Sequence, residues 1–446
     1  MKTFSIISLG CPRNQVDSEV IAGSLKAAGF RQGDVEDGVD VCVVNTCAFI
    51  ESAREESVEA IIAAADYKKK GKVKRLVICG CLPQLYKEKL AVELPEADLI
   101  LGTNDVPVIA DLIDSRPRKA AQPKISQRVS YLYDEHSPRL LFTPKHYAYI
   151  KISEGCANAC SYCIIPRLRG ASRSRTVESV LAEIRNISSD GLLKEVILIG
   201  QDTTAYGIDR YGAPELSRLL RAVCAQDNSI RWARLMYTHP AHYTDELIDT
   251  IGEESRICKY LDLPIQHISG RILKLMNRKC GRRDIECLLR KLRKKVPGLI
   301  LRTSVIVGFP GETDGDFKEL LGFLKEAKFG RLGAFIYSRE EGTRAARLKG
   351  HVSNAVKRER YDAVMRQQQG ISARANRAFI GKCLDVLVDE KAGMEKGKYI
   401  ARTQGDAPEI DGAVYITGKN IKAGEFCKVK ITDALEYDLV GEKVQA

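Results

Sequence analysis

Residues 151–170, KISEGCANACSYCIIPRLRG, place three thiols, Cys156, Cys160 and Cys163, in the spacing C-x3-C-x2-C. The segment directly follows an apolar stretch with the pattern of a buried strand. Thiolates are soft ligands that suit zinc or iron–sulfur clusters. A structural zinc site needs four protein ligands, typically in two pairs, and no second pair follows at the usual distance. The spacing therefore predicts an iron–sulfur cluster with one iron left open to a small molecule.

Five further strand-like segments follow this first one, and segments of helical length separate them. The six predicted strands cover residues 148–155, 194–202, 230–238, 259–266, 299–309 and 331–338. Six such units are enough for a partial (β/α)6 barrel but fall short of the eight of a closed barrel. We place this core at residues 142–371.

The residues ahead of the core show the same alternation. Strands are predicted at 4–10, 39–46, 74–80 and 97–102, and helices at 16–29, 51–70 and 83–94. Regular β-α alternation with buried strands implies a parallel, doubly wound sheet. The sequence thus predicts an α/β multidomain chain with an N-terminal domain at 1–118 and a linker at 119–141.

The pattern changes after the core. Residues 353–378 have helical periodicity, interrupted only by Gly370, and short alternating strands follow at 383–390, 398–405, 412–417 and 425–434. Short strands separated by turns indicate a small all-β barrel, which we place at 374–440.

A second set of thiols lies in the N-terminal domain. Cys11, Cys47 and Cys81 each follow one of three successive strands. Because the carboxyl ends of parallel strands meet at one edge of a sheet, these thiols should converge into a second site. Chance placement is the alternative, since cysteine is often simply buried. Cys42 lies within a strand, whereas Cys79 points to the same side as Cys81 and is its main competitor.

The composition of the chain bears on its cellular location, on the role of its cysteines and on its partners. The amino terminus lacks a signal-peptide pattern and the longest apolar run is far below the roughly 18 residues of a membrane span, so we expect a cytoplasmic protein. Cytosolic thiols stay reduced, so the 14 cysteines indicate metal ligation, catalysis or packing. The net charge is +12, and residues 136–370 hold 40 Lys and Arg against 26 Asp and Glu. This excess suits an RNA-containing partner or an ordinary solvated surface.

The first triad, after the first strand of a six-stranded partial barrel, resembles the radical S-adenosylmethionine (SAM) superfamily. With the second triad and the small β-barrel, the whole chain resembles the methylthiotransferase family within it. That resemblance implies a flavodoxin-like N-terminal domain and a TRAM-like C-terminal barrel. It also implies two 4Fe-4S clusters, with Cys11, Cys47 and Cys81 as ligands of the first. Cys156, Cys160 and Cys163 would then hold the second, where one SAM yields a radical while another supplies the methyl group.

Two branches of that family compete, one modifying a transfer-RNA adenosine and the other an aspartate β-carbon of small-subunit ribosomal protein S-twelve. The segments SLGCPRNQVDSE, GQDTTAYGID and GDAPEIDGAVYI resemble the second branch. The C-terminal barrel holds equal numbers of acidic and basic residues, which argues against a grip on RNA. Its acidic side chains Asp406, Glu409 and Asp411 would suit a basic ribosomal protein or the small subunit. Alternatively, this segment is only a turn.

The resemblance implies further contacts with SAM. Gln201 and Asp202 would lie near its amino group, and Gly308 and Gly311 would let the backbone approach its adenosine; a purely local role in turns is the alternative for both glycines. The family implies an electron donor of flavodoxin or ferredoxin type and a sulfur donor, and we expect a monomer. A non-catalytic two-cluster electron carrier is the competing class, although ferredoxins usually complete each cluster with four cysteines.

Overall fold

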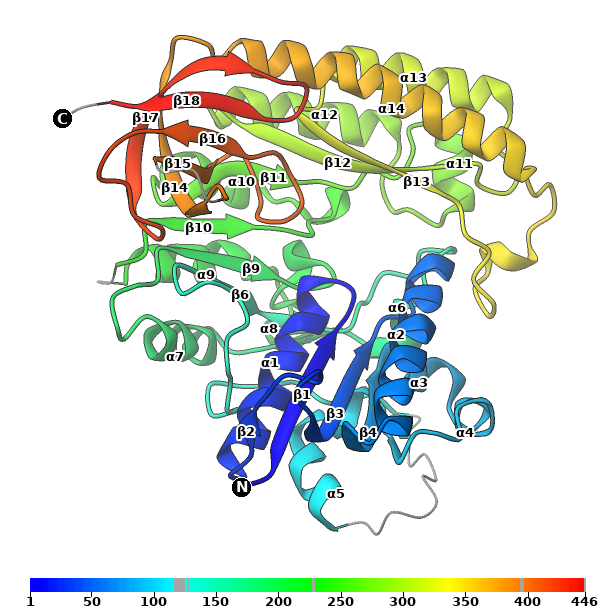
Figure 1. Ribbon diagram of the computed structural model, residues 1–446. Helices are drawn as coiled ribbons and strands as arrows, with labels where there is room; N and C mark the ends of the chain where they lie inside the picture. Colours follow the sequence, from blue (N-terminus) through cyan, green and yellow to red (C-terminus); the bar gives the residue numbers. More distant parts are fainter. Residues whose placement is uncertain (116–124, 127, 227–228, 394–396, 445–446) are drawn as a thin grey trace.

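The protein is described by a computed structural model that covers residues 1–115, 125–126, 128–226, 229–393 and 397–444. Part of the predicted linker, residues 119–124 and 127, lies outside the described residues. Figure 1 shows three units: the N-terminal domain in blue and cyan, the central sheet in green and yellow, and the C-terminal barrel in orange and red.

The N-terminal domain is a five-stranded parallel sheet in the order β2-β1-β3-β4-β5. Its strands are β1 (Thr3–Ser8), β2 (Arg31–Gln32), β3 (Val39–Thr46), β4 (Val73–Gly80) and β5 (Leu99–Ile100). Its helices are α1 (Pro12–Ala27), α2 (Glu51–Lys69), α3 (Cys81–Tyr86), α4 (Glu88–Glu93) and α5 (Ile109–Ser115). This strand order is that of flavodoxin, so the predicted fold is confirmed. The helix expected at 83–94 is split at Lys87, whose φ of +50° ends α3.

The core is a six-stranded parallel sheet in the order β13-β12-β11-β10-β9-β6, which confirms the predicted partial barrel. Its strands are β6 (Tyr147–Lys151), β9 (Glu195–Ile199), β10 (Trp232–Leu235), β11 (Ile257–Asp262), β12 (Ile300–Val307) and β13 (Arg331–Ile336). The hairpin strands β7 (Ser153–Glu154) and β8 (Arg173–Ser174) pair separately. Alternate residues face opposite sides, so Ala148 and Ile150 pack in one hydrophobic cluster and Tyr147 and Tyr149 in another.

Helices cover the outer face of this sheet (Figure 1). They are α7 (Val177–Ile187), α9 (Leu216–Cys224), α10 (Asp245–Glu253), α12 (Arg282–Lys295), α13 (Asp314–Ala327) and α14 (Asn354–Arg377). The short helices α6 (Ile165–Arg169), α8 (Ile208–Tyr211) and α11 (Gly270–Leu275) lie in the segments after β6, β9 and β11, and α6 contacts α3 of the N-terminal domain. Within the described ranges, no helix has both the length and the apolar character that a bilayer span requires.

The C-terminal unit is a closed five-stranded barrel in the order β14-β15-β16-β18-β17, which confirms the predicted small barrel. Its strands are β14 (Cys383–Lys391), β15 (Lys398–Thr403), β16 (Val414–Thr417), β17 (Phe426–Ala434) and β18 (Leu439–Lys443). The last strand was not among the predicted ones, and it closes the barrel by pairing with both β16 and β17.

The loop between β15 and β16 joins this barrel to the core. Asp406 accepts a hydrogen bond from Nη2 of Arg331 at 2.6 Å, and Asp411 accepts one from the Tyr260 hydroxyl at 2.6 Å. Arg302 also donates from Nε to Asp411, at 3.3 Å. Arg302 and Arg331 lie near the starts of β12 and β13, so the loop docks toward the amino ends of the core strands.

The pair between Asp406 and Arg331 should stabilise this docking. Asp406→Ala leaves the buried Arg331 guanidinium without its carboxylate, which costs about 3–5 kcal/mol for pairs of this kind. We therefore expect a clearly lower midpoint in thermal unfolding followed by circular dichroism. Glu442→Ala on β18 of the same barrel is the control, because this side chain is exposed and makes no hydrogen bond or ion pair with the described residues, so its loss should leave the midpoint nearly unchanged. Equal midpoints for the two variants would contradict this role of the pair.

Candidate functional site

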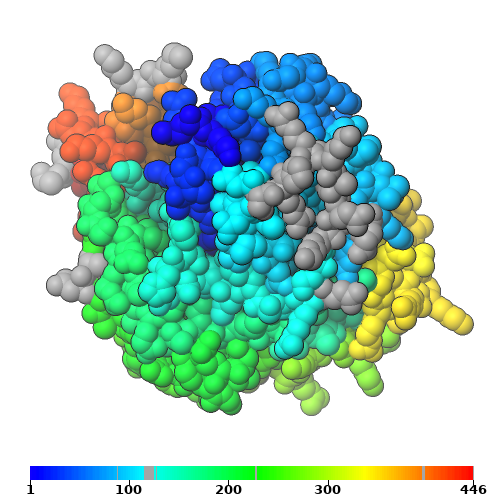
Figure 2. Space-filling model, turned by 90° about the horizontal axis from the view of Figure 1, so that it is seen from below, coloured from blue at the N-terminus to red at the C-terminus, as the bar shows by residue number. Residues whose placement is uncertain are grey.

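A cavity of about 440 Å³ lies between the N-terminal domain and the carboxyl ends of the core strands. Residues that directly follow β9, β10 and β13 line it, among them Gln201, Tyr237 and Tyr337. Cys11 and Phe49 reach it from the N-terminal domain, so two domains form its walls. Figure 2 shows these two units, blue to cyan and green, packed against each other over a broad contact.

The three thiols of the core, Cys156, Cys160 and Cys163, all line this cavity. Backbone hydrogen bonds hold their loop: the N–H of Cys156 donates to the carbonyl of Gly170, and that of Cys163 to the carbonyl of Cys160, both at 3.1 Å. Burial raises the pKa of Cys163 to about 12. This thiol therefore becomes a thiolate only beside a strong positive charge, which a bound metal supplies.

The thiols of the N-terminal domain also converge. Cys11 caps α1, Cys47 follows β3 and Cys81 opens α3. Burial first, and then the neighbouring Cys81 and Cys11, raise the pKa of Cys47 to about 12. Gly10, with φ of +88°, makes room for the side chain of Cys47, because a Cβ on Gly10 would lie 2.9 Å from the Cys47 sulfur. The ends of β1, β3 and β4 thus place Cys11 and Cys81 near enough to Cys47 for their charges to raise its pKa.

The chemistry of both triads fits iron–sulfur clusters better than single ions. A tetrahedral zinc ion would hold its sulfurs about 3.8 Å apart. In neither triad do all three sulfurs lie within 4.8 Å of one another. Among the described residues, the one set of three metal-binding side chains that does meet this limit is Asp202, His239 and His242. A cluster needs the wider spacing because each cysteine binds a different iron.

Two arginines donate hydrogen bonds to the N-terminal thiols. Nε of Arg13 lies 3.4 Å from the sulfur of Cys11, and Nη2 of Arg169 lies 3.3 Å from that of Cys81. Burial raises the pKa of Cys11, but the charge and hydrogen bond of Arg13 outweigh it, and the net shift is downward. Cys11 therefore favours the thiolate form, whereas burial raises the pKa of both Cys47 and Cys81.

Cys79 and Cys42 do not join the N-terminal triad. Cys79 is buried in β4, where it packs with Val43 and Val77, and its thiol faces the side-chain oxygen of Asn45 at 3.8 Å. Cys42 is buried within β3. Both cysteines are placed as hydrophobic core residues.

The structure separates the two predicted SAM contacts after β9. Gln201 lines the cavity, and its buried Oε1 has no hydrogen-bond partner in the described part of the chain, so it can accept from a bound ligand. The carboxylate of Asp202 instead accepts hydrogen bonds from Asn158 at 2.6 Å and from His242 at 2.7 Å. Asp202 therefore supports the cysteine loop through Asn158, and its contact with SAM stays a prediction.

His239 and His242 were missed by sequence reasoning. They lie in the segment THPAH, residues 238–242, directly after β10, and their rings stack with 5.0 Å between centroids. Burial lowers the pKa of His239 to about 3, so it is neutral at physiological pH. The sequence did contain one indication that this segment belongs to the site. The segment directly follows a strand, and the carboxyl ends of the strands are where the site was predicted.

Gly308 and Gly311 are not among the described residues that line the cavity, and both make close packing contacts, so their approach to adenosine stays a prediction. A Cβ on Gly308 would lie 2.3 Å from Cγ of Lys357 on α14, so the absent side chain lets α14 pack closely. The N–H of Gly311 donates to the carbonyl of Gly350 at 2.7 Å. From β12 it is Arg302, Ser304 and Ile306 that line the cavity.

The acidic loop also differs from the prediction. Asp406 and Asp411 are buried and bind Arg331 and Arg302 of the core, so they are not available as an acidic surface for a basic partner. Local composition could not show this, because Asp, Pro and Gly equally suit an exposed turn. Glu409 alone of the three is exposed, and it accepts a hydrogen bond from the Tyr147 hydroxyl at 3.2 Å. Ile410 from this loop lines the cavity.

Three segments of the chain match known families. Residues 150–324 match the radical SAM superfamily, residues 3–102 match "Uncharacterized protein family UPF0004", and residues 380–444 match the TRAM domain.

The core also resembles solved radical SAM structures. Against TsrM from Kitasatospora setae the TM-score is 0.54, with 16% identity over 75% of this chain and 73% of that one. Against the cobalamin-dependent OxsB it is 0.53, with 14% identity over 83% and 56%. The chain is therefore a radical SAM enzyme, a class that uses SAM and a 4Fe-4S cluster.

Closer relatives identify the family. The chain is 46% identical to "Ribosomal protein uS12 methylthiotransferase RimO" of Desulforamulus reducens over 100% of both proteins. It is 47% identical to the RimO proteins of Geobacter sulfurreducens, over 98% of both, and of Clostridioides difficile, over 99% of both. The chain belongs to the RimO family of methylthiotransferases, and the alternative of a transfer-RNA enzyme is not favoured.

The assignment of Cys81 over Cys79 can be tested by counting iron. Cys81→Ala should lower bound iron in the reconstituted protein from about eight to about four atoms, because one cluster loses a ligand. Cys79→Ala is the control, since its thiol is part of the core and the iron content should not change. Cys156→Ala should also remove about four atoms, from the other cluster. Loss of iron with Cys79→Ala but not with Cys81→Ala would show that the two residues have been exchanged.

Proposed function

We propose that this enzyme transfers a methylthio group to the β-carbon of an aspartate in ribosomal protein uS12, either free or in the small ribosomal subunit. In the proposed reaction, one SAM supplies the methyl group and a second one the radical. The names of the relatives support the substrate, and their similarity extends over the full chain.

One observation carries the chemistry. Cys11 of the N-terminal triad and all three cysteines of the core triad line the same cavity. We therefore infer that Cys11, Cys47 and Cys81 hold a second 4Fe-4S cluster beside the one at Cys156, Cys160 and Cys163. Two such sites opening on one cavity would let sulfur delivery and carbon activation act on one substrate carbon.

When bound, the core cluster and SAM supply the radical that removes hydrogen from an unreactive carbon. Residues around the core triad position the cysteine loop and keep water out of the cavity. The N–H of Asn158 donates to the sulfur of Cys156 at 3.4 Å, and Asp202 fixes the Asn158 side chain. Met236, Ile306 and Ile410 give the cavity apolar walls, which exclude water. Oε1 of Gln201, which has no hydrogen-bond partner among the described residues, can accept a hydrogen bond from a ligand.

The proposed reaction requires partners. Reduction of the clusters calls for an electron donor of flavodoxin or ferredoxin type, and the inserted sulfur calls for a sulfur donor. We further propose that the enzyme acts in the cytoplasm, where ribosomes assemble, and that it works as a monomer.

Mass spectrometry after deletion of the gene tests the substrate. We expect peptides of uS12 to lose the mass of one methylthio group while the nucleosides of transfer RNA stay unchanged. Expression of the wild-type chain should restore the modification, and Cys156→Ala should not, because it lacks a ligand of the core cluster.

A loss of the methylthio group from transfer RNA alone would refute the proposed substrate. The purified, reduced protein should also form 5′-deoxyadenosine from SAM. A protein that holds both clusters but forms none would instead favour the electron-carrier alternative.

A further inference from the structure

Arg169 connects the core to the N-terminal thiols. It ends α6, six residues after Cys163, yet its side chain reaches across the domain boundary. Its Nη2 lies 3.3 Å from the sulfur of Cys81 and 3.0 Å from the side-chain oxygen of Asn14. Arg169 is 4% exposed, so water does not compete for these hydrogen bonds.

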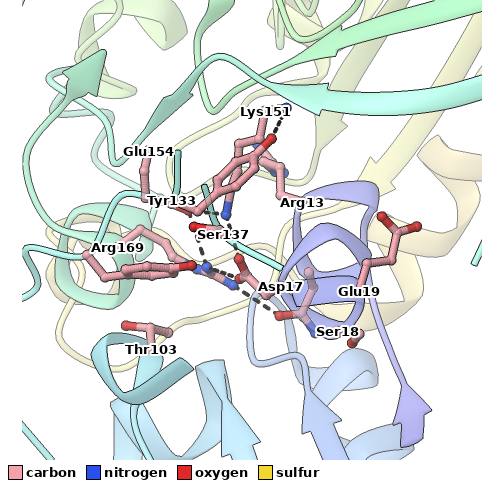
Figure 3. A network of polar contacts seen from close by, with 12 residues as sticks. Arg13, Asp17, Ser18, Glu19, Thr103, Tyr133, Ser137, Lys151, Glu154 and Arg169 are labelled. Carbon is pink, nitrogen blue, oxygen red and sulfur yellow. Dashed lines mark hydrogen bonds and ion pairs between the residues drawn. The ribbon is translucent and has the colours of Figure 1, made fainter. Parts of the chain in front are cut away.

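A network of buried charges fixes the guanidinium in place. Asp17 of α1 accepts hydrogen bonds from both Arg169 and Lys151, and Glu154 pairs with both as well (Figure 3). The two carboxylates therefore neutralise the charges of the two cations. They also hold the Arg169 guanidinium in the orientation in which it faces Cys81. The N–H that reaches the sulfur is thus preorganised.

Arg169 differs from the other arginine at the N-terminal thiols. Arg13 donates to Cys11, stacks on the ring of Tyr237 at 4.5 Å and lines the cavity. Arg169 is not among the residues of the cavity wall that the structure describes. A substitution of Arg169 therefore removes a contact of the N-terminal thiols but removes no residue from the described cavity wall.

We propose that Arg169 is a positioning residue through which the core sets the reduction potential of the N-terminal cluster; this rests on the proposed two-cluster function. Hydrogen bonds to ligand sulfurs and nearby positive charge stabilise the reduced form, which carries one more electron. The step is a one-electron reduction by an external reductant, and no bond forms or breaks. Arg169 also shields the Cys81 ligand, which should slow the loss of iron.

The variants Arg169→Gln and Arg169→Lys test this in the full-length protein with both clusters reconstituted. Redox titration followed by electron paramagnetic resonance, with and without SAM, separates the clusters, because SAM perturbs the signal of the one that binds it. Arg169→Gln should make the potential of the N-terminal cluster more negative, and Arg169→Lys should shift it less, because the charge remains. Release of this cluster's iron to a chelator should become several-fold faster in Arg169→Gln.

Arg139→Gln is the matched control. Arg139 is also a buried cation at the same domain boundary, but it donates to Glu19, Glu183 and the carbonyl of Tyr149. Its variant should leave the potential unchanged. The SAM-binding cluster should keep its potential in every variant.

A wild-type potential and iron release in Arg169→Gln would overturn the proposal, as would an equal shift in Arg139→Gln. If Arg169→Gln does not fold, the reduction potential and the iron release of Arg169→Lys test the proposal instead. A wild-type protein that binds only about four iron atoms would overturn the two-cluster function and this inference with it. A shifted potential without modification of uS12 would refute the proposed function alone.

Discussion

The position of Asp17 between Lys151 and Arg169 is the constraint on which the rest of this structure depends. These three side chains are at most 5% exposed, and they join α1 of one domain to β6 and α6 of another. Moving such charges out of water costs several kcal/mol each, so they are favourable only when every partner is present. This network therefore helps to hold the two domains in the arrangement in which they share one cavity.

The same constraint explains why the two cysteine triads open toward each other. Cys81 and Asn14 contact Arg169, while Arg13 reaches into the core and donates to the carbonyl of Gly200 at 3.0 Å. Each domain thus places one arginine against the other. The proposed function requires the two cysteine sites to lie close together so that both act on one carbon, and the docking of the domains brings Cys11 and the core triad to one cavity.

The sequence predicted what depends on local order and topology. The spacing of Cys156, Cys160 and Cys163 lies within eight residues, and the strand-end positions of Cys11, Cys47 and Cys81 follow from parallel sheets. The roles of Arg169, Asp406 and Gly308 could not be predicted in this way. Each depends on a partner far along the chain, namely Cys81, Arg331 and Lys357, and no local pattern reports how domains pack. Buried charges in particular look like solvated ones in a sequence.

Ile410 has a consequence for the evolution of this architecture. The small C-terminal barrel is separated from the core in sequence, yet one of its loops supplies part of the wall against which the substrate would react. Exchange of that barrel between relatives by recombination would therefore reshape the reaction chamber as well as any docking surface. The barrel is thus a separate unit in sequence but not in structure, because one loop both lines the cavity and contacts Tyr260 and Arg302 of the core.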